Sequence, residues 1–235
     1  MNVTLLSLRN DARERCDLVH SRFVTDTELT SYVNASLKEL YDLLVSSYSD
    51  YYTSDPLEFT VVSDGYSLPD DFYKLRLLER SFDNSGNESS YYTLNQFNFM
   101  EKNRYNNVGG QSLGNYPIVQ YRVMGSANLT GNGKIKFSPT TQEAGLYRLH
   151  YIPKCPALVD DADELNGING WEEYIIVDCC IKMLQKQEDD VSVFQFQKKE
   201  LIGRIEAMAA ERDASQPGRI TDARGRGGWD GGGIW

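Results

Sequence analysis

The chain has 235 residues, 40% of them hydrophobic, so it is long enough for one large domain or two small ones with a substantial core. Its 34 acidic and 24 basic side chains leave a net charge of -10, which argues against a general nucleic-acid binder because such proteins are normally basic. No stretch approaches the roughly 20 apolar residues of a membrane span, and no secretory signal pattern is visible. We therefore expect a soluble protein made in a cytoplasm, with no membrane partner.

Two helices are predicted at the amino-terminal end. Apolar residues recur every three or four positions over 4–19, which predicts a first helix. Thr25 or Asp26 can cap a longer second helix, which should end before Asp55-Pro56. Its one-sided apolar stripe consists of Leu29, Val33, Leu37, Leu40, Leu44, Tyr48 and Tyr51.

The middle of the chain favours β structure. Strands are predicted over 57–62, 118–124, 134–137 and 146–152. Asp64-Gly65 is a turn signal that follows the first of them. The polar stretch 81–115 is rich in Asn, Ser, Gly and Tyr, and we predict loops there with a short helix over 94–103.

Helical spacing returns after Gly170. Residues 171–187 are apolar around most of the helix circumference, which predicts a helix buried between others. A last helix is predicted over 191–213, before Pro217-Gly218, with Val191, Phe194, Leu201, Ile205 and Met208 on one stripe. The order predicts an α+β fold: mainly an α-helical bundle built from both chain ends, with a β-rich insertion and an extended C-terminal tail. We predict the N-terminal helices of the bundle at 1–55, the β-rich insertion at 56–157, the C-terminal helices of the bundle at 158–217 and the extended Gly-rich tail at 218–235.

Sites for catalysis or for a metal are not indicated. Neither His20 nor His150 has a nearby Ser/Asp arrangement, so a catalytic triad is not predicted. The run GSANLTGNGKI fails as a phosphate-binding loop, because Asn128 and Ile135 stand where that motif needs Gly and Ser or Thr. The acids at 160–164 lack the Gly and terminal Glu of a calcium loop. We predict no enzyme activity, no cofactor and no metal.

The four cysteines do not form a metal or disulfide pattern. None belongs to a CxxC pair, and two are adjacent in a predicted helix, where neighbouring side chains diverge. We predict buried free thiols. The four are Cys16, Cys155, Cys179 and Cys180.

The last eighteen residues, 218–235, contain seven glycines together with Ile220, Trp229, Ile234 and Trp235. Glycine loses the most backbone entropy on ordering, so this tail has no reason to order alone. Burial of both Trp side chains stabilises by roughly 10 kcal/mol at most, whereas ordering eighteen residues costs about 18 to 36 kcal/mol. We therefore interpret the tail as a peptide that docks on a partner.

An alternative interpretation makes the tail a single-stranded nucleic-acid-binding module. Arg219, Arg224 and Arg226 would contact phosphates, and Trp229 and Trp235 would stack on bases. Salt-sensitive binding to single strands would favour this alternative.

Three segments in chain order resemble a known family. They are GYSLPDDFYKLRLLE at 65–79, IKFSPTTQEAGLYRLHYIP at 135–153, and the stretch 165–222 that begins LNGINGWEEYIIVDCC. Taken together they are similar to tailed-bacteriophage head-to-tail connector proteins, which are also called adaptor or neck proteins. The glycine-rich end beyond Asp222 matches no shared pattern.

The resemblance implies a structural virion protein that is synthesised in the host cytoplasm and located in the neck of the particle. It implies a homo-oligomeric ring, typically of twelve, under the portal protein, which extends the DNA channel and carries tail or nozzle proteins. Genomic DNA would pass through without sequence-specific binding. The portal-docking residues would then be Arg219, Ile220, Arg224, Arg226, Trp229, Ile234 and Trp235.

Acidic residues are concentrated in 160–190, where the simplest interpretation is a solvated helix face. In a connector they could instead face the channel, where repulsion of phosphate would let DNA slide. The candidate channel-facing acids are Asp160, Asp161, Asp163, Glu164, Glu188, Asp189 and Asp190.

Overall fold

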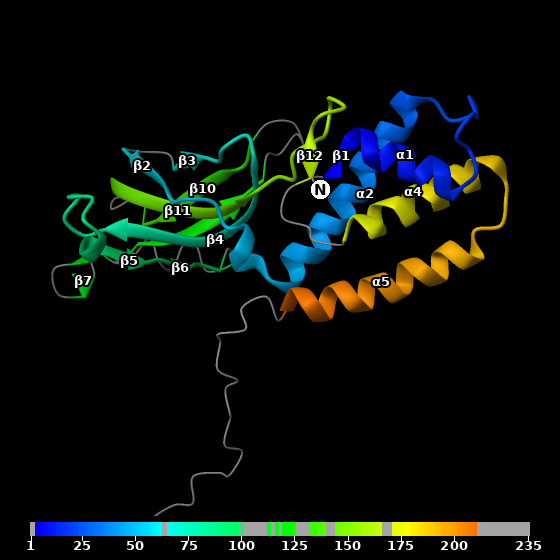
Figure 1. Cartoon of the computed structure of the whole chain (residues 1–235). Coiled ribbons are helices and arrows are strands. Elements are labelled where there is room, and N and C mark those ends of the chain that lie inside the picture. The colour runs from blue at the N-terminus through cyan, green and yellow to red at the C-terminus, as the bar shows by residue number, and fades with distance from the viewer. Residues whose placement is uncertain are drawn as a thin grey trace, which may run out of the picture.

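A computed structural model describes residues 3–62, 65–98, 100, 112–113, 116–117, 119–125, 132–139, 144–165 and 171–210. Helices and sheets are both present, which confirms the α+β class. The helical part and the β part lie end to end (Figure 1). The predicted tail over 218–235 lies outside the described residues, as do all seven side chains proposed to dock on the portal.

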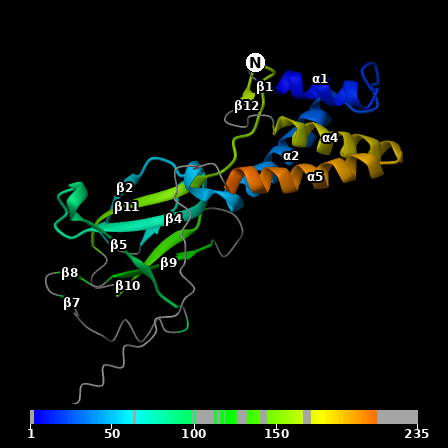
Figure 2. The ribbon, with the colours of Figure 1, turned by 60° about the horizontal axis from the view of Figure 1, so that its bottom comes forward.

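The α-helices come from both ends of the described chain and share one apolar core. They are α1 (Leu5–Arg15), α2 (Asp26–Ser47), α4 (Glu172–Gln187) and α5 (Ser192–Ala210). Both α1 and α5 pack on the pair formed by α2 and α4. Figures 1 and 2 show α1 and α5 on opposite sides of that pair.

Helix α4 is the most deeply buried, as its all-round apolar sequence predicts. Ile175, Cys179 and Met183 are completely buried on it. The first helix ends at Arg15, earlier than predicted. The second ends before Asp55-Pro56, as predicted, but already at Ser47, and a 3-10 turn, η1 (Ser49–Tyr52), follows it. Tyr51, expected on the buried stripe, is 54% exposed because the chain has left the helix there.

The β part consists of two four-stranded sheets whose inner faces share a second apolar core. One sheet has the order β2-β11-β4-β5 and the other β3-β10-β9-β6. The strands of the first are β2 (Leu57–Val61), β4 (Phe72–Ser81), β5 (Tyr91–Thr93) and β11 (Gly145–Pro153). Those of the second are β3 (Tyr66–Ser67), β6 (Asn95–Gln96), β9 (Gln120–Met124) and β10 (Lys134–Ser138).

Strand register places large apolar side chains between the sheets. Leu149 of β11 lies opposite Leu57 on one side and Leu78 on the other. Tyr147 and Leu149 are fully buried in this strand, which the sequence predicted over 146–152. Gly65, in the predicted turn, has a φ of +76°, and a Cβ there would meet the carbonyl oxygen of Ile135 at 2.1 Å. Only glycine fits that conformation and that approach.

In the middle of the chain one prediction is wrong and one strand was missed. Residues 94–98 are not helical, because Asn95–Gln96 forms β6 and pairs in parallel with β9. The longest described strand, β4, was not predicted at all. Its sequence FYKLRLLERS mixes charged and apolar residues without a clean period of two, and its pairing with β11 is interrupted by register shifts.

Shorter elements complete the fold. A two-stranded ribbon joins β1 (Val3–Thr4) to β12 (Glu164–Leu165), and β7 (Ser112–Leu113) pairs with β8 (Tyr116–Pro117). A 3-10 turn, η2 (Glu88–Ser90), precedes β5. None of the described helices has the length and apolar character to cross a bilayer.

Tyrosines join the helical part to the sandwich. The ring of Tyr41 on α2 lies 5.3 Å from that of Tyr52 and 6.1 Å from that of Tyr73 on β4. The Tyr41 hydroxyl donates to the carbonyl oxygen of Pro153 at 2.8 Å. Burial raises the pKa of Tyr41 to about 12.

Candidate functional site

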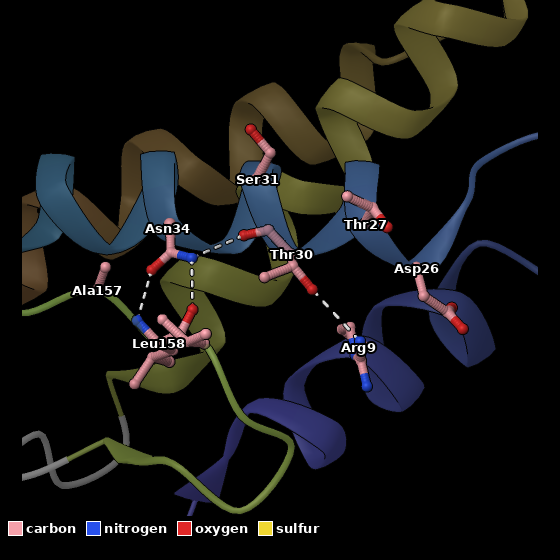
Figure 3. Close-up of a pocket in the computed structure, with 9 residues that line it drawn as sticks. Arg9, Asp26, Thr27, Thr30, Ser31, Asn34, Ala157 and Leu158 are labelled. Carbon is pink, nitrogen blue, oxygen red and sulfur yellow. Dashed lines mark hydrogen bonds between the residues drawn. The ribbon is translucent and has the colours of Figure 1, made fainter.

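A groove with a volume of about 500 Å³ opens on the surface of the helical part (Figure 3). It lies between α1, α2 and the segment 154–163, which connects β11 to β12. Helix α2 supplies a row of short polar side chains, and the segment supplies apolar ones. The lining residues are Arg9, Asp26, Thr27, Thr30, Ser31, Asn34, Ala157, Leu158 and Val159.

Asn34 attaches the floor of the groove to α2. Its side-chain oxygen accepts from the Leu158 amide at 2.8 Å, and its side-chain nitrogen donates to the Leu158 carbonyl oxygen at 2.8 Å. The amide group thus mimics a neighbouring strand and satisfies both backbone groups of Leu158. Leu158 is 5% exposed, whereas the next residue, Val159, is 74% exposed.

Arg9 closes the other wall of the groove. It donates to the Thr30 hydroxyl at 3.3 Å and forms an ion pair with Asp161. The same segment caps α1, because the carbonyl oxygens of Asp163 and Asp161 accept from the amides of Leu5 and Leu6 at 3.0 and 3.2 Å. These amides open the helix and have no partner within it, so the segment and α1 hold each other in place.

Three of the seven candidate channel acids accept hydrogen bonds that shape the backbone or join elements. Asp161 pairs with Arg9. Asp163 accepts from the amides of Val159 and Asp160 at 2.6 and 2.9 Å, and these bonds lower its pKa. Asp190 accepts from the amide and hydroxyl of Ser192 at the start of α5, which lowers its pKa as well.

The other four acids are exposed. Asp160 lies beside the groove, and Glu164 is in β12, opposite Thr4. Glu188 ends α4 with a φ of +62°, and Asp189 follows it. The structure does not bring the seven together. Figure 1 shows the group at 160–164 at the end of the helical part nearer the sandwich and the group at 188–190 at the far end. Helix α4, about 24 Å long, separates them.

A buried charge cluster holds α2, α4 and α5 together. Asp178 of α4 is 3% exposed. Its carboxylate accepts from Lys182 at 2.5 Å, from Lys198 of α5 at 2.7 Å and from the Ser36 hydroxyl of α2 at 2.6 Å. Lys198 also pairs with Glu39 at 2.9 Å. The sequence carried a signal for this cluster, because Asp178 stands among apolar residues in the middle of the helix, four residues before Lys182.

The cysteines are free, as predicted, although only half of them are buried. Cys179 and Cys180 are fully buried in α4, while Cys16 and Cys155 are half-buried. Burial raises the pKa of the Cys155 thiol to about 11 and that of Cys179 to about 12. Among the described residues, no group of three or more His, Cys, Asp or Glu side chains is placed to hold a metal ion.

A family model that covers nearly the whole chain places it in the class of structural adaptor proteins of bacteriophages. The model of the family described as SU10 adaptor protein matches residues 3–221, which is nearly the whole chain. The chain therefore belongs to the SU10 adaptor protein family, a family of phage head-tail adaptors, in agreement with the resemblance seen in its sequence. None of the curated proteins compared with the chain matches it.

Proposed function

We propose that the protein forms a ring under the portal in the neck of the virion, extends the DNA channel and joins the head to the tail. The family match over residues 3–221 carries this proposal. The architecture supports it, because an adaptor needs separate surfaces for separate partners. Here the helical part and the β-sandwich each have their own core and lie end to end (Figure 2).

Within this proposal the ring contains twelve copies, the tail over 218–235 docks on the portal, and the sandwich is available to tail or nozzle proteins. Tail burial alone does not offset the cost of ordering the tail, so docking needs backbone hydrogen bonds to the portal. It also needs the avidity of many identical tails. Tail docking and ring formation should therefore depend on each other.

The first experiment measures the mass of the purified protein in solution, alone and mixed with portal protein. Full-length chain and a chain ending at Gln216 are compared. We expect portal-dependent rings for the full-length chain and a loss of portal binding for the shorter one, because only the tail is missing. Equal behaviour of both chains with portal would contradict tail docking. A monomer indifferent to portal in both forms would contradict the adaptor function.

The same samples test the nucleic-acid alternative. If the tail binds single strands, full-length protein should bind a labelled oligonucleotide with an affinity that falls steeply with salt. The chain ending at Gln216 would then lose that binding. Under the adaptor proposal neither chain binds the oligonucleotide.

A further inference from the structure

Two of the free cysteines meet where α1 packs on α4 (Figures 1 and 2). Cys16 caps the carboxyl end of α1, and Cys180 lies in the middle of α4. Both reach one carbonyl oxygen, that of Ala12: the Cys16 amide donates to it at 3.3 Å, and the Cys180 sulfur lies 3.6 Å from it. The two thiol groups also interact with each other. Cys16 and Cys180 are therefore neighbouring thiols from segments far apart in the sequence.

The other two cysteines face different surroundings. Cys179 approaches α2, where its sulfur lies 3.7 Å from the Ser36 hydroxyl. Side chains at adjacent helix positions point about 100° apart, so of the two neighbours on α4 it is Cys180 that faces the end of α1. Cys155 follows β11 and lies near Lys38 of α2. The contact between Cys16 and Cys180 thus selects one pair among the four thiols.

The two thiols of the pair differ in access and in acidity. Cys16 is half-buried, whereas Cys180 is fully buried. The Cys180 thiol and the positive charge of Arg15 lower the pKa of Cys16, while contact with Cys16 and burial raise the pKa of Cys180. The thiolate is the form that attacks a disulfide. Cys16 is therefore the reachable nucleophile, and Cys180 is a second thiol held beside it.

We infer that Cys16 and Cys180 form a disulfide when the protein meets a small-molecule disulfide oxidant, and that this bond fastens α1 to α4. The Cys16 thiolate attacks one sulfur of the oxidant, which forms a mixed disulfide and releases one small thiolate. Cys180 gives its proton to that thiolate and attacks the Cys16 sulfur, which releases the second. Two protein thiols are oxidised and one small disulfide is reduced, so atoms and electrons balance.

The bond closes a loop of roughly 160 residues that contains the whole β-sandwich. A crosslink over so long a loop restricts the unfolded chain and so stabilises the folded one. Proteins meet disulfide oxidants when they leave a reducing cytoplasm. For a virion protein this happens when particles leave the host cell. That setting, though not the bond itself, rests on the proposed function.

Oxidation of the isolated full chain tests the pair. Reduced protein is incubated with an excess of glutathione disulfide, the remaining thiols are blocked with N-ethylmaleimide, and mass spectrometry of proteolytic peptides identifies the linked cysteines. Cys16→Ser removes the reachable thiol of the pair. Its control, Cys155→Ser, removes the other half-buried thiol. Circular dichroism checks that both variants keep the fold.

We expect the oxidised wild type to yield a peptide in which Cys16 is linked to Cys180. Its melting temperature should rise by about 5 °C or more and fall back when dithiothreitol is added. Cys155→Ser should respond like the wild type, because its pair is complete. Cys16→Ser should show no rise, because Cys180 then has no partner.

Two results would overturn the disulfide. One is a wild type in which Cys16 stays free, or carries glutathione without a link to Cys180. The other is a melting temperature that glutathione disulfide raises equally in Cys16→Ser. None of these measurements involves portal protein or assembly. Failure of the protein to form a ring would therefore leave the disulfide in place, and failure to form the disulfide would leave the ring in place.

Discussion

Asp178 is a charge in the middle of an apolar helix, and its surroundings explain why it is tolerated. A buried carboxylate is costly unless it is paired and hydrogen-bonded. Here two lysines and a serine from three helices surround it. Burial alone would raise the pKa of Asp178, but the bonds from Lys182, Lys198 and Ser36 outweigh it and hold the pKa below its usual range. The residue therefore acts as a polar connection between helices.

Replacement of Asp178 by Asn should lower the free energy of unfolding by about 3 kcal/mol at pH 7, because Lys182 and Lys198 lose their buried counter-charge. Urea unfolding measures the change. The control, Asp189→Asn in the exposed connection between α4 and α5, should change stability by less than about 0.5 kcal/mol. If Asp178→Asn also lowered the free energy of unfolding by less than about 0.5 kcal/mol, the cluster would make no net contribution to stability.

The pH dependence follows from the direction of the same pKa shift. A carboxyl group whose pKa is lower in the folded chain than its unfolded value of about 3.9 stabilises the fold above that value. The contribution disappears as the pH falls through the folded-state pKa. The difference in stability between wild type and Asp178→Asn should therefore be constant from pH 5 to 7 and shrink in stronger acid.

At the scale of elements, α5 shows how a predicted stripe can join two different surfaces. Phe194, Leu201 and Ile205 of that stripe pack on the helical core, as predicted. Met208 was predicted to join them and instead is 59% exposed. Apolar residues occur on both sides of α5, so spacing alone could not tell which side meets the core.

Two substitutions on α5 separate those sides in the unassembled protein. Ile205→Ala removes a completely buried side chain and should lower the free energy of unfolding by about 2 to 4 kcal/mol. Met208→Ala, one turn of helix away, should change it by no more than about 0.5 kcal/mol. Chemical unfolding of both variants at low protein concentration gives the comparison. Similar losses would mean that Met208 belongs to the core.

At the scale of the whole molecule, the helical part and the sandwich have separate cores joined by the tyrosine contacts around Tyr41. The acids proposed to line a DNA channel are divided between the two ends of the helical part (Figure 1). In the assembled ring, the acids at 160–164 and those at 188–190 would therefore meet a channel at different positions along its axis. Glu188 and Asp189 are suitable for a test of charge alone, because their side chains accept no hydrogen bond from the described residues.

Replacement of Glu188 and Asp189 by Lys should slow DNA ejection from particles that carry the variant, if this end faces the channel, because phosphate would then be attracted instead of repelled. Stability of the isolated protein should not change. The control makes the same change of charge at Asp11 and Glu14, which are exposed on α1. Ejection that is unchanged in the first variant, or equally slowed in the control, would count against a channel role for these two acids.

Local pattern was sufficient for much of the helical part and for the main strands. A helix that buries one side must repeat its apolar residues every three or four positions, so the stripe from Leu29 to Leu44 indicated α2 directly. The alternation of Tyr147, Leu149 and Tyr151 likewise indicated β11. The ordered segments at 65–79, 135–153 and 165–222 were sufficient to indicate the adaptor family.

Only the tertiary structure decided where the surfaces are. Strand β4 depends on partners on both sides, β11 and β5, whose pairing overrides its charged sequence. The groove joins residues as distant in sequence as Arg9, Asn34 and Leu158, and the Asp178 cluster joins Ser36 to Lys198. Periodicity reports which side of one element is apolar, because it reflects burial along a single axis. It carries no information about which other element covers that side, and that pairing determines both the core and the surfaces left for partners.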